Sequence, residues 1–272
     1  AVQMYKNILF DFNFDKQAGI EYAQMEYQDL QNYTEAERVA KRAVLDHHIN
    51  DKDGILLLGD IYLDWATEKD PAKFEAARTQ YSNLIQLYGQ KNLYLSRMMR
   101  YFIRTDNLRE VLQMKEHFMP SAKSLEAADW TELSGYLLDK LYGPLAPADE
   151  YLRGKIEDVK ELLLRAVKAD RKNPIALYNL SRYYVKTNNG TYAKESLEQT
   201  IDAFKKAVSL KPRDTYKEID SYRLLGEQYT KEREYLKAEE IYTGGLSIWT
   251  DEHDTSGFES TPQIGELYAD AA

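Results

Sequence analysis

A short spacing of large and small residues recurs along this chain and constrains its fold more than any other feature. It consists of Leu, a small residue, two further residues and Tyr, and it occurs at Leu225-Gly226-x2-Tyr229, Leu180-Ser181-x2-Tyr184 and Leu58-Gly59-x2-Tyr62. Recurrence of one pattern in register is typical of proteins that fold by stacking similar units. We therefore expect a repeat architecture.

The copy at Leu225 is part of a longer pattern that begins at Tyr222 and continues with Ala238, Tyr242 and Gly245. This stretch resembles the W-x2-L-G-x2-Y...A-x3-F pattern of the tetratricopeptide repeat (TPR) family, a helix-turn-helix unit of about 34 residues. The resemblance implies an all-α superhelix, a right-handed solenoid of about six repeats between residues 17 and 252. It also implies a chain that binds partners and has no catalytic activity.

Two further copies have clear markers on both sides of an enlarged turn. One starts at Pro174 and Leu177, turns at Asn188-Asn189-Gly190 and ends with Phe204, Ala207 and Pro212. The other starts at Ile55, turns through Asp70-Pro71 and continues with Ala77 and Tyr81. Asn and Gly tolerate positive φ, which favours a turn at residues 188–190.

The remaining three copies are less regular. The first has Tyr27, a turn over residues 30–33, then Ala36, Ala40 and Ala43, with Ala23 and Gln24 in place of Leu-Gly. The next has Leu95, Met98 and Phe102, a turn over residues 105–107, and Val111. The third has Trp130, Leu133, Ser134 and Leu137, an insertion over residues 141–147, and a second helix over about 156–168 with Leu163 and Ala166 inward.

The small residues in these patterns have a mechanical reason. Where two helices cross closely, Gly or Ala allows a large neighbour such as Tyr229 or Tyr242 to pack against backbone. Enlarging Ala238 to Leu should therefore overpack the crossing and cost about 1–3 kcal/mol, which thermal unfolding measures.

The two ends of the chain are expected to differ from the repeats. Residues 1–16 are rich in apolar side chains and predict a helix packed on the first repeat, or the remnant of a preceding one. Residues 253–272 predict a polar loop and a short capping helix that starts at Thr261-Pro262 and carries Ile264, Leu267 and Tyr268 on one face. The chain starts with Ala1 and not Met, so it is either processed or a segment of a longer protein.

Charge and composition exclude several classes of function. The formal net charge of −9 disfavours general nucleic-acid binding, which depends on attraction to phosphate. No apolar run approaches the roughly 18 residues that span a bilayer, so we expect a soluble chain without membrane insertion, in either the cytoplasm or the periplasm. The absence of Cys excludes disulfides and thiolate chemistry.

We find no pattern that predicts catalysis, a metal site or a cofactor. The four His residues, His47, His48, His117 and His253, form no HExxH pair. Residues 50–54 resemble a calcium loop but lack two of its ligands, and a turn between repeats explains them better. Asp60 and Asp64 lie one helical turn apart, which is more typical of a solvated helix face than of an acid–base pair. The sequence therefore favours a protein that is not an enzyme.

In the TPR family the first helices of successive repeats line a concave groove that holds a peptide or a partner's helix. The resemblance implies that residues one and two turns apart on these helices, away from the core, bind the partner. The candidates are Ser96, Arg97, Arg100, Arg104, Tyr178, Asn179, Arg182, Lys186, Arg223, Glu227 and Lys231. The first two repeats contribute acidic residues instead, namely Glu21, Asp29, Asp53, Asp60 and Asp64.

These residues predict a groove that is acidic at its N-terminal end and mostly basic from the middle onward. The most specific part of this prediction is the set Arg97, Arg100 and Arg104, because three guanidinium groups on one face repel each other unless carboxylates are near. The partner would then have acidic character. The alternative is that these arginines pair with acidic residues of neighbouring helices or project into water.

The sequence thus favours a scaffold or adaptor that binds a protein partner in the concave groove. A first alternative is an assembly component of a large bacterial or cell-envelope complex, which uses convex faces and chain ends and forms a homo-oligomer or larger assembly. A second is the regulatory or small-ligand-binding region of a longer protein.

Overall fold

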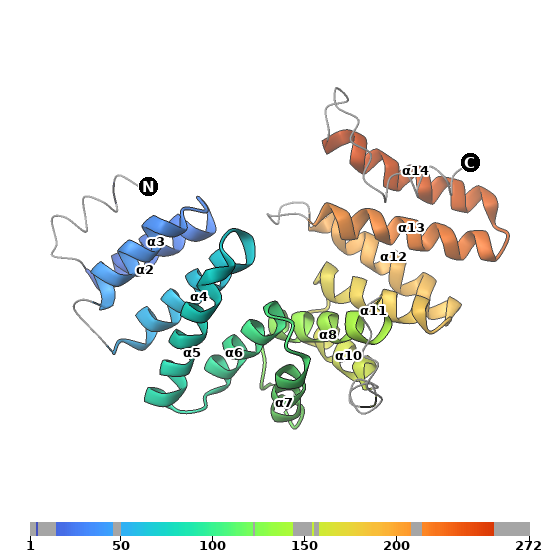
Figure 1. Cartoon of the computed structure of the whole chain (residues 1–272). Coiled ribbons are helices and arrows are strands. Elements are labelled where there is room, and N and C mark those ends of the chain that lie inside the picture. Colours follow the sequence, from blue (N-terminus) through green and yellow to red (C-terminus); the bar gives the residue numbers. More distant parts are fainter. Residues whose placement is uncertain are drawn as a thin grey trace. The chain divides into compact units, whose positions relative to one another are not determined.

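The structure is a computed structural model of the 272-residue chain. It describes residues 15–45, 50–121, 123–143, 158–207 and 214–252, together with residues 4 and 154. All regular elements within these residues are helices, so the predicted all-α helical-repeat class is confirmed (Figure 1). The chain divides into two compact units, Ala1–Leu125 and Glu126–Ala272, which we describe separately.

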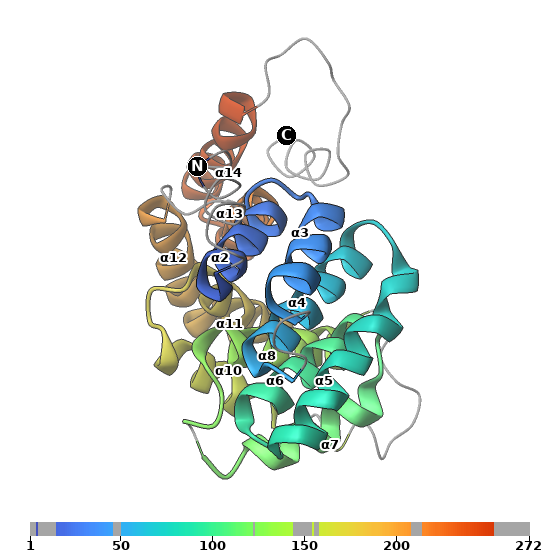
Figure 2. The same ribbon diagram turned by 90° about the vertical axis from the view of Figure 1, so that its left-hand side faces the viewer.

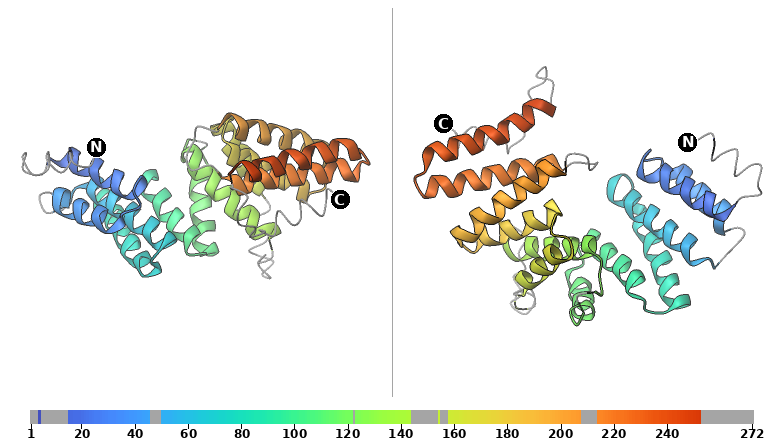
Figure 3. Two further views of the ribbon diagram at one scale, coloured as in Figure 1. Left: turned by 90° about the horizontal axis from the view of Figure 1, so that it is seen from above. Right: turned by 180° about the vertical axis from the view of Figure 1, so that it is seen from behind.

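The helices of the described residues form six successive pairs, as predicted. In the first unit the pairs are α2 (Lys16–Gln28) with α3 (Tyr33–Val39), α4 (Lys52–Glu68) with α5 (Phe74–Tyr88), and α6 (Asn92–Arg104) with α7 (Leu108–Phe118). In the second they are α8 (Ala127–Tyr142) with α10 (Val159–Ala169), α11 (Pro174–Lys186) with α12 (Gly190–Lys206), and α13 (Thr215–Lys231) with α14 (Tyr235–Glu252). Figures 2 and 3 show neighbouring helices side by side, among them α2 with α3 and α13 with α14.

Side-chain caps begin many of these helices. Asp15, Asn32, Asn107 and Asp214 each accept a hydrogen bond from a backbone amide of the first turn. This satisfies one of the donors that a helix start leaves unpaired. Asp51 caps α4 by accepting from the amides of Asp53 and Gly54, so residues 50–54 form a turn and helix start, as expected.

The turns inside four pairs share one left-handed residue. Gln31, Asp106, Asn188 and Arg233 have φ between 50° and 64°, a region that non-glycine residues visit mainly in turns. The amide that follows closes the first helix in three of them, from Asn107 to Phe102, Asn189 to Tyr184 and Glu234 to Tyr229. The same turn therefore recurs in both units.

This common turn corrects one expectation about the pair α11–α12. Its turn is not enlarged, because α11 ends at Lys186 and α12 begins at Gly190, and the extra residues lengthen α12 instead. Ala193 and Leu197, both fully buried, follow the turn at the distances of Ala238 and Tyr242. The turn through Asp70-Pro71 is enlarged as predicted, and the 3₁₀-helix η2 (Pro71–Lys73) fills it.

The small residues lie where the helices of a pair cross. A Cβ on Gly59 would lie 2.6 Å from Cε1 of Tyr81, and a Cβ on Gly226 would overlap the ring of Tyr242. Both rings are buried, with 0% and 2% of their surface exposed. The predicted reason for a small residue at these two positions is therefore present in the structure.

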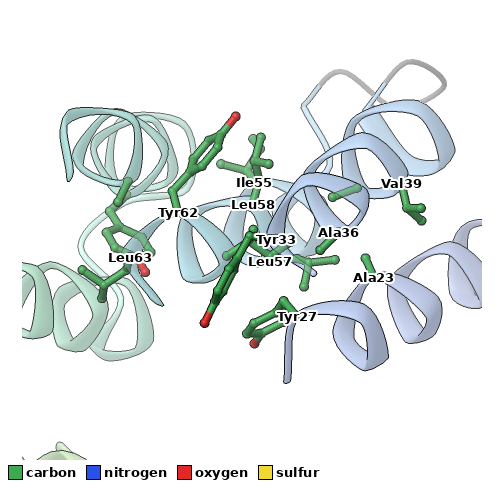
Figure 4. Packing of buried hydrophobic residues seen from close by; sticks show 14 of the residues in the cluster. Ala23, Tyr27, Tyr33, Ala36, Val39, Ile55, Leu57, Leu58, Tyr62 and Leu63 are labelled. Atoms are coloured by element: carbon green, nitrogen blue, oxygen red, sulfur yellow. The ribbon is translucent and has the colours of Figure 1, made fainter. Parts of the chain in front are cut away.

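Each unit has its own buried core. In the first unit the side chains of Tyr22, Ala23, Tyr33 and Tyr62 pack with aliphatic residues of α4, and Figure 4 shows Tyr27, Tyr33 and Leu57 between the helices. In the second, Trp130, Leu133 and Leu137 are fully buried, and so are Leu163 and Ala166, as predicted. The first repeat departs from its expected form, since the π-helix η1 (Ala40–Leu45) continues α3.

Several expectations concern residues outside the described part. They include residues 5–14 and 253–272 with their predicted terminal helices, the side chain of Ala43, residues 144–147, Ile156, Pro212, His47, His48 and His253. Met4, the one described residue among the first fourteen, is 65% exposed.

Candidate protein-interaction surface

Most of the predicted binding residues on the first helices occupy three repeated positions, whereas Arg97 and Asn179 do not. The three positions lie three residues before, one after and five after the crossing residue Gly59 or Gly226, or its equivalent in register, which is Met99, Ser134 or Ser181. Because these positions are one helical turn apart, they lie along one side of each helix. We call this side the first-helix face of each unit.

Burial changes regularly along this face. The last position is exposed in all five helices, at Asp64, Arg104, Asp139, Lys186 and Lys231. The middle position is half-buried, at Asp60, Arg100, Gly135, Arg182 and Glu227. Exposed charge is therefore concentrated at the C-terminal end of each first helix.

The expectation that all candidates face away from the core is wrong for Ser96, Tyr178 and Asn179, which are at most 4% exposed. The hydroxyl of Tyr178 donates to Oδ2 of Asp220 on α13 over 2.8 Å. The amide of Asn179 donates to the carbonyl of Thr131 on α8 over 3.4 Å. These side chains connect the first helices of the second unit to one another.

In the first unit, Arg97 on α6 forms an ion pair with Asp60 on α4, with 3.1 Å between Nε and Oδ1. The hydroxyl of Tyr81 donates to the same carboxylate over 2.8 Å. Arg97 thus has the neighbouring-helix partner that the alternative interpretation requires. The acidic row of α4 and the basic row of α6 lie in the same unit and neutralise each other in part.

Two carboxyl groups of α4, those of Asp60 and Asp64, have raised pKa values. Burial raises the pKa of Asp60, although the charge of Arg97 and the hydrogen bond from Tyr81 oppose the shift. Asp64 presents part of its side chain to solvent, but partial desolvation of its carboxyl and the nearby charge of Asp60 raise its pKa to about 6. Arg104 and Arg100 act against this shift.

In the second unit the arginines of the first-helix face also have acidic neighbours. Arg182 pairs with Asp139 over 2.7 Å and lies over the ring of Tyr178 at 5.4 Å. Arg223 donates to Asp220 over 2.8 Å and also contacts Glu227. Only their remaining exposed surface is available to a partner.

Lys186 and Lys231 differ from these arginines. Both are exposed, both end a first helix, and the side chain of neither forms a hydrogen bond or ion pair with the described residues. Among the acidic candidates, Glu21 accepts from Gln17 and Asp53 contacts Lys16, while Asp29 is exposed after the end of α2.

The second unit also has two surface hollows beside the N-terminal end of α11. One, of about 600 Å³, is lined by Arg171, Lys172, Leu177 and residues of α12 that include Asp202 and Lys206. The other, of about 760 Å³, includes Asn173, Phe204, Asp214 and Tyr216. Within the described ranges no group of three or more His, Asp or Glu side chains is placed to hold a metal ion.

Sequence reasoning did not find the interhelical pairs that organise the first-helix face. Asp60 and Arg97 are 37 residues apart, and Tyr178 and Asp220 are 42 apart. The unusual number of tyrosines, 22, was the one available signal, because buried hydroxyl groups require partners.

None of the described helices is long and apolar enough to cross a membrane.

Comparison with known proteins supports the fold. No protein-family model matches the chain, and a search of curated proteins finds no significant relative. Among solved structures, the assembly chaperone of RpL4 (Acl4) aligns with 94% of this chain and 94% of its own, at 16% identity and a TM-score of 0.53. The C-terminal part of a TPR repeat-containing protein from Cytophaga hutchinsonii aligns with 98% of this chain and 93% of its own, at 13% identity and a TM-score of 0.53.

At this level of identity the similarity shows the fold alone. The chain is thus a helical-repeat protein whose architecture is similar to that of a TPR repeat-containing protein and of an assembly chaperone.

Proposed function

We propose that the chain is a TPR-like, non-catalytic scaffold that binds a peptide or helix of a protein partner on the first-helix face. The observation that carries this proposal is the row of exposed charged side chains at one register position of successive first helices. Within each unit such a row offers repeated contacts to an extended partner, while the paired residues beneath it keep the helices in place.

The partner we propose has acidic character where it meets the second unit. We expect three arginines to bind the partner less strongly than the sequence predicts, because each already has a carboxylate neighbour: Arg97, Arg182 and Arg223. Lys186 and Lys231 contribute more, since both are exposed and neither has an acidic partner among the described residues. Two such lysines on consecutive first helices favour carboxylates spaced along one segment.

The similar fold of an assembly chaperone is a precedent for this architecture in a protein that handles another protein. It does not identify the partner, since a shared fold does not imply a shared ligand.

The test is affinity capture from the native source with quantified recovery. We expect Lys186→Glu with Lys231→Glu to reduce recovery of a specific partner at least about tenfold, which corresponds to ~1.4 kcal/mol. The matched control is Lys168→Glu with Arg171→Glu, which reverses two exposed charges at the end of α10 and in the loop that follows it. Equal recovery by wild type and by both double variants would contradict the proposed surface.

A further inference from the structure

The second unit has a line of tyrosine rings at the ends of its helices, which the scaffold function does not use. The rings of Tyr142 on α8 and Tyr183 on α11 meet edge to face at 6.2 Å. The ring centroids of Tyr183 and Tyr184 lie 5.8 Å apart, and Tyr184 stacks on Tyr192 of α12 with 5.4 Å between ring centroids and 25° between ring planes. We call these four residues the tyrosine edge.

The tyrosine edge is accessible, and an ion pair links it to the next pair of helices. Tyr192 is 55% exposed, and the other three rings are half-buried. An ion pair between Lys194 and Glu232 joins the start of α12 to the turn between α13 and α14. Just after that turn, Tyr235 and Leu236 are 62% and 84% exposed. Large apolar side chains gathered in this way mark an interaction site more often than isolated ones do.

The charges around the tyrosine edge are unequal. Three carboxylates of this region are already engaged: Glu198 accepts from Tyr229, Glu232 pairs with Lys194, and Glu234 pairs with Lys237. Four cations have no carboxylate partner among the described residues, namely Lys160, Lys186, Lys231 and Arg233. Lys160 lies over the ring of Tyr184 at 5.8 Å.

Glu195 lies one helical turn after Tyr192 on α12 and is an exposed carboxylate beside the tyrosine edge. Glu198 also keeps its negative charge, because its hydrogen bond comes from a neutral hydroxyl group. The four cations without a carboxylate partner still outnumber Glu195 and Glu198, although the formal net charge of the whole chain is −9. A basic surface on an acidic protein favours an acidic partner through charge complementarity.

We infer that the tyrosine edge binds an acidic segment of a partner protein that also carries an aromatic or aliphatic side chain. The apolar side chain packs on the stacked rings of Tyr184 and Tyr192, and the flanking carboxylates bind Lys160 and Lys186. Tyrosine suits this role because it gives a large contact area and loses little side-chain entropy on binding. This inference rests on the proposed function and adds a second contact, at the helix ends, for the same kind of partner.

The experiment uses the full chain and a fluorescein-labelled peptide of about 12 residues that alternates Asp-Glu pairs with single Phe residues. Fluorescence anisotropy gives its dissociation constant. We expect Tyr192→Ala to raise the constant at least about tenfold and Lys160→Glu to raise it several-fold. Two matched controls should leave it unchanged: Tyr216→Ala, which removes a tyrosine that is 53% exposed on α13, and Lys168→Glu at the other end of α10.

Three results would overturn the inference. The first is equal binding of the peptide to the Tyr192→Ala and Tyr216→Ala variants. The second is equal binding of a control peptide in which Lys replaces every Asp and Glu. The third is that the chain forms a dimer, does not bind the peptide, and becomes monomeric when Tyr192 is replaced by Ala. The last result would assign the surface to a second copy of the chain. Each of these results leaves the capture experiment with Lys186 and Lys231 intact, so failure of the inference is distinguishable from failure of the proposed function.

Discussion

Tyrosine hydroxyl groups in this chain repeatedly donate to carboxylates on another helix. Tyr33 donates to Glu68, Tyr62 to Glu37, Tyr81 to Asp60, Tyr178 to Asp220 and Tyr229 to Glu198, over 2.6–2.8 Å. The ring of each tyrosine packs among apolar side chains while its hydroxyl needs an acceptor. The abundance of Tyr and of acidic residues thus has a common structural cause.

The pair formed by Tyr178 and Asp220 should be the most costly of these to break from the acidic side. Asp220 is 6% exposed and also accepts from Arg223, so Asp220→Ala removes the acceptor of the buried Tyr178 hydroxyl and one of the two carboxylates that Arg223 contacts. We expect a loss of about 1–3 kcal/mol of unfolding free energy for Asp220→Ala and about 0.5–1.5 kcal/mol for Tyr178→Phe. Urea unfolding measures both, and a larger cost for Tyr178→Phe would contradict the assigned network.

Asp64 should make stability depend on pH with an unusual sign. Its pKa is raised to about 6 in the folded chain and is near 3.9 when unfolded, so between these values the folded state binds more protons. Stability contributed by Asp64 therefore increases as pH falls from about 7 to about 4. The like charge of Asp60 is part of the cause.

Asp64→Asn removes this titration. We expect the variant to have a higher melting temperature than wild type at pH 7 and a smaller advantage at pH 5, where wild-type Asp64 is largely protonated. Thermal unfolding at the two pH values measures the difference between the chains. An advantage that grows at pH 5 would show that Asp64 is stabilised as the carboxylate.

At the scale of helices, the crossing within two of the pairs depends on one residue without a side chain. Gly59 faces the ring of Tyr81 and Gly226 faces that of Tyr242. The corresponding position is Ser181 in the pair α11–α12 and Met99 in the pair α6–α7. In these pairs a residue with a side chain therefore occupies the position of the glycine. A helix pair therefore tolerates a larger residue here only if its second helix carries a smaller one or shifts.

Gly226→Ala and Gly59→Ala should each destabilise the chain by about 1–3 kcal/mol, because the added methyl group overlaps a buried tyrosine ring. Gly190→Ala is the matched control, since no atom lies closer than 4.0 Å to its added Cβ and Ala favours a helix. Equilibrium unfolding in urea compares the three variants. A cost for Gly190→Ala equal to that of Gly226→Ala would contradict close packing at the crossing.

For the molecule as a whole, the sequence predicts the repeated units well and the surface between them poorly. The spacing of Gly59 to Tyr62 or of Leu225 to Tyr229 lies within one helix, so a local pattern suffices to place these residues. The sequence predicts too long a turn at residues 187–189. One left-handed residue, Asn188, closes the helix sooner than Asn-Asn-Gly suggests.

The binding face could not be predicted completely, because it depends on contacts between helices far apart in sequence. Tyr178 and Asn179 have the register of exposed residues but are covered by α13 and α8, respectively. Arg97 is held by Asp60, which the sequence placed on the same face without relating the two. Lys186 and Lys231 were predicted correctly as exposed, since they end their helices and no other described side chain covers them.

Hydrogen–deuterium exchange of the chain with and without its captured partner tests the central claim, that the partner binds the C-terminal ends of the first helices. We predict slower exchange at the backbone amides of the last turns of α11 and α13 and in the turns at residues 187–189 and 232–234. Protection confined to α10, or to residues 243–248 on α14, with no change at the ends of α11 and α13, would contradict the account.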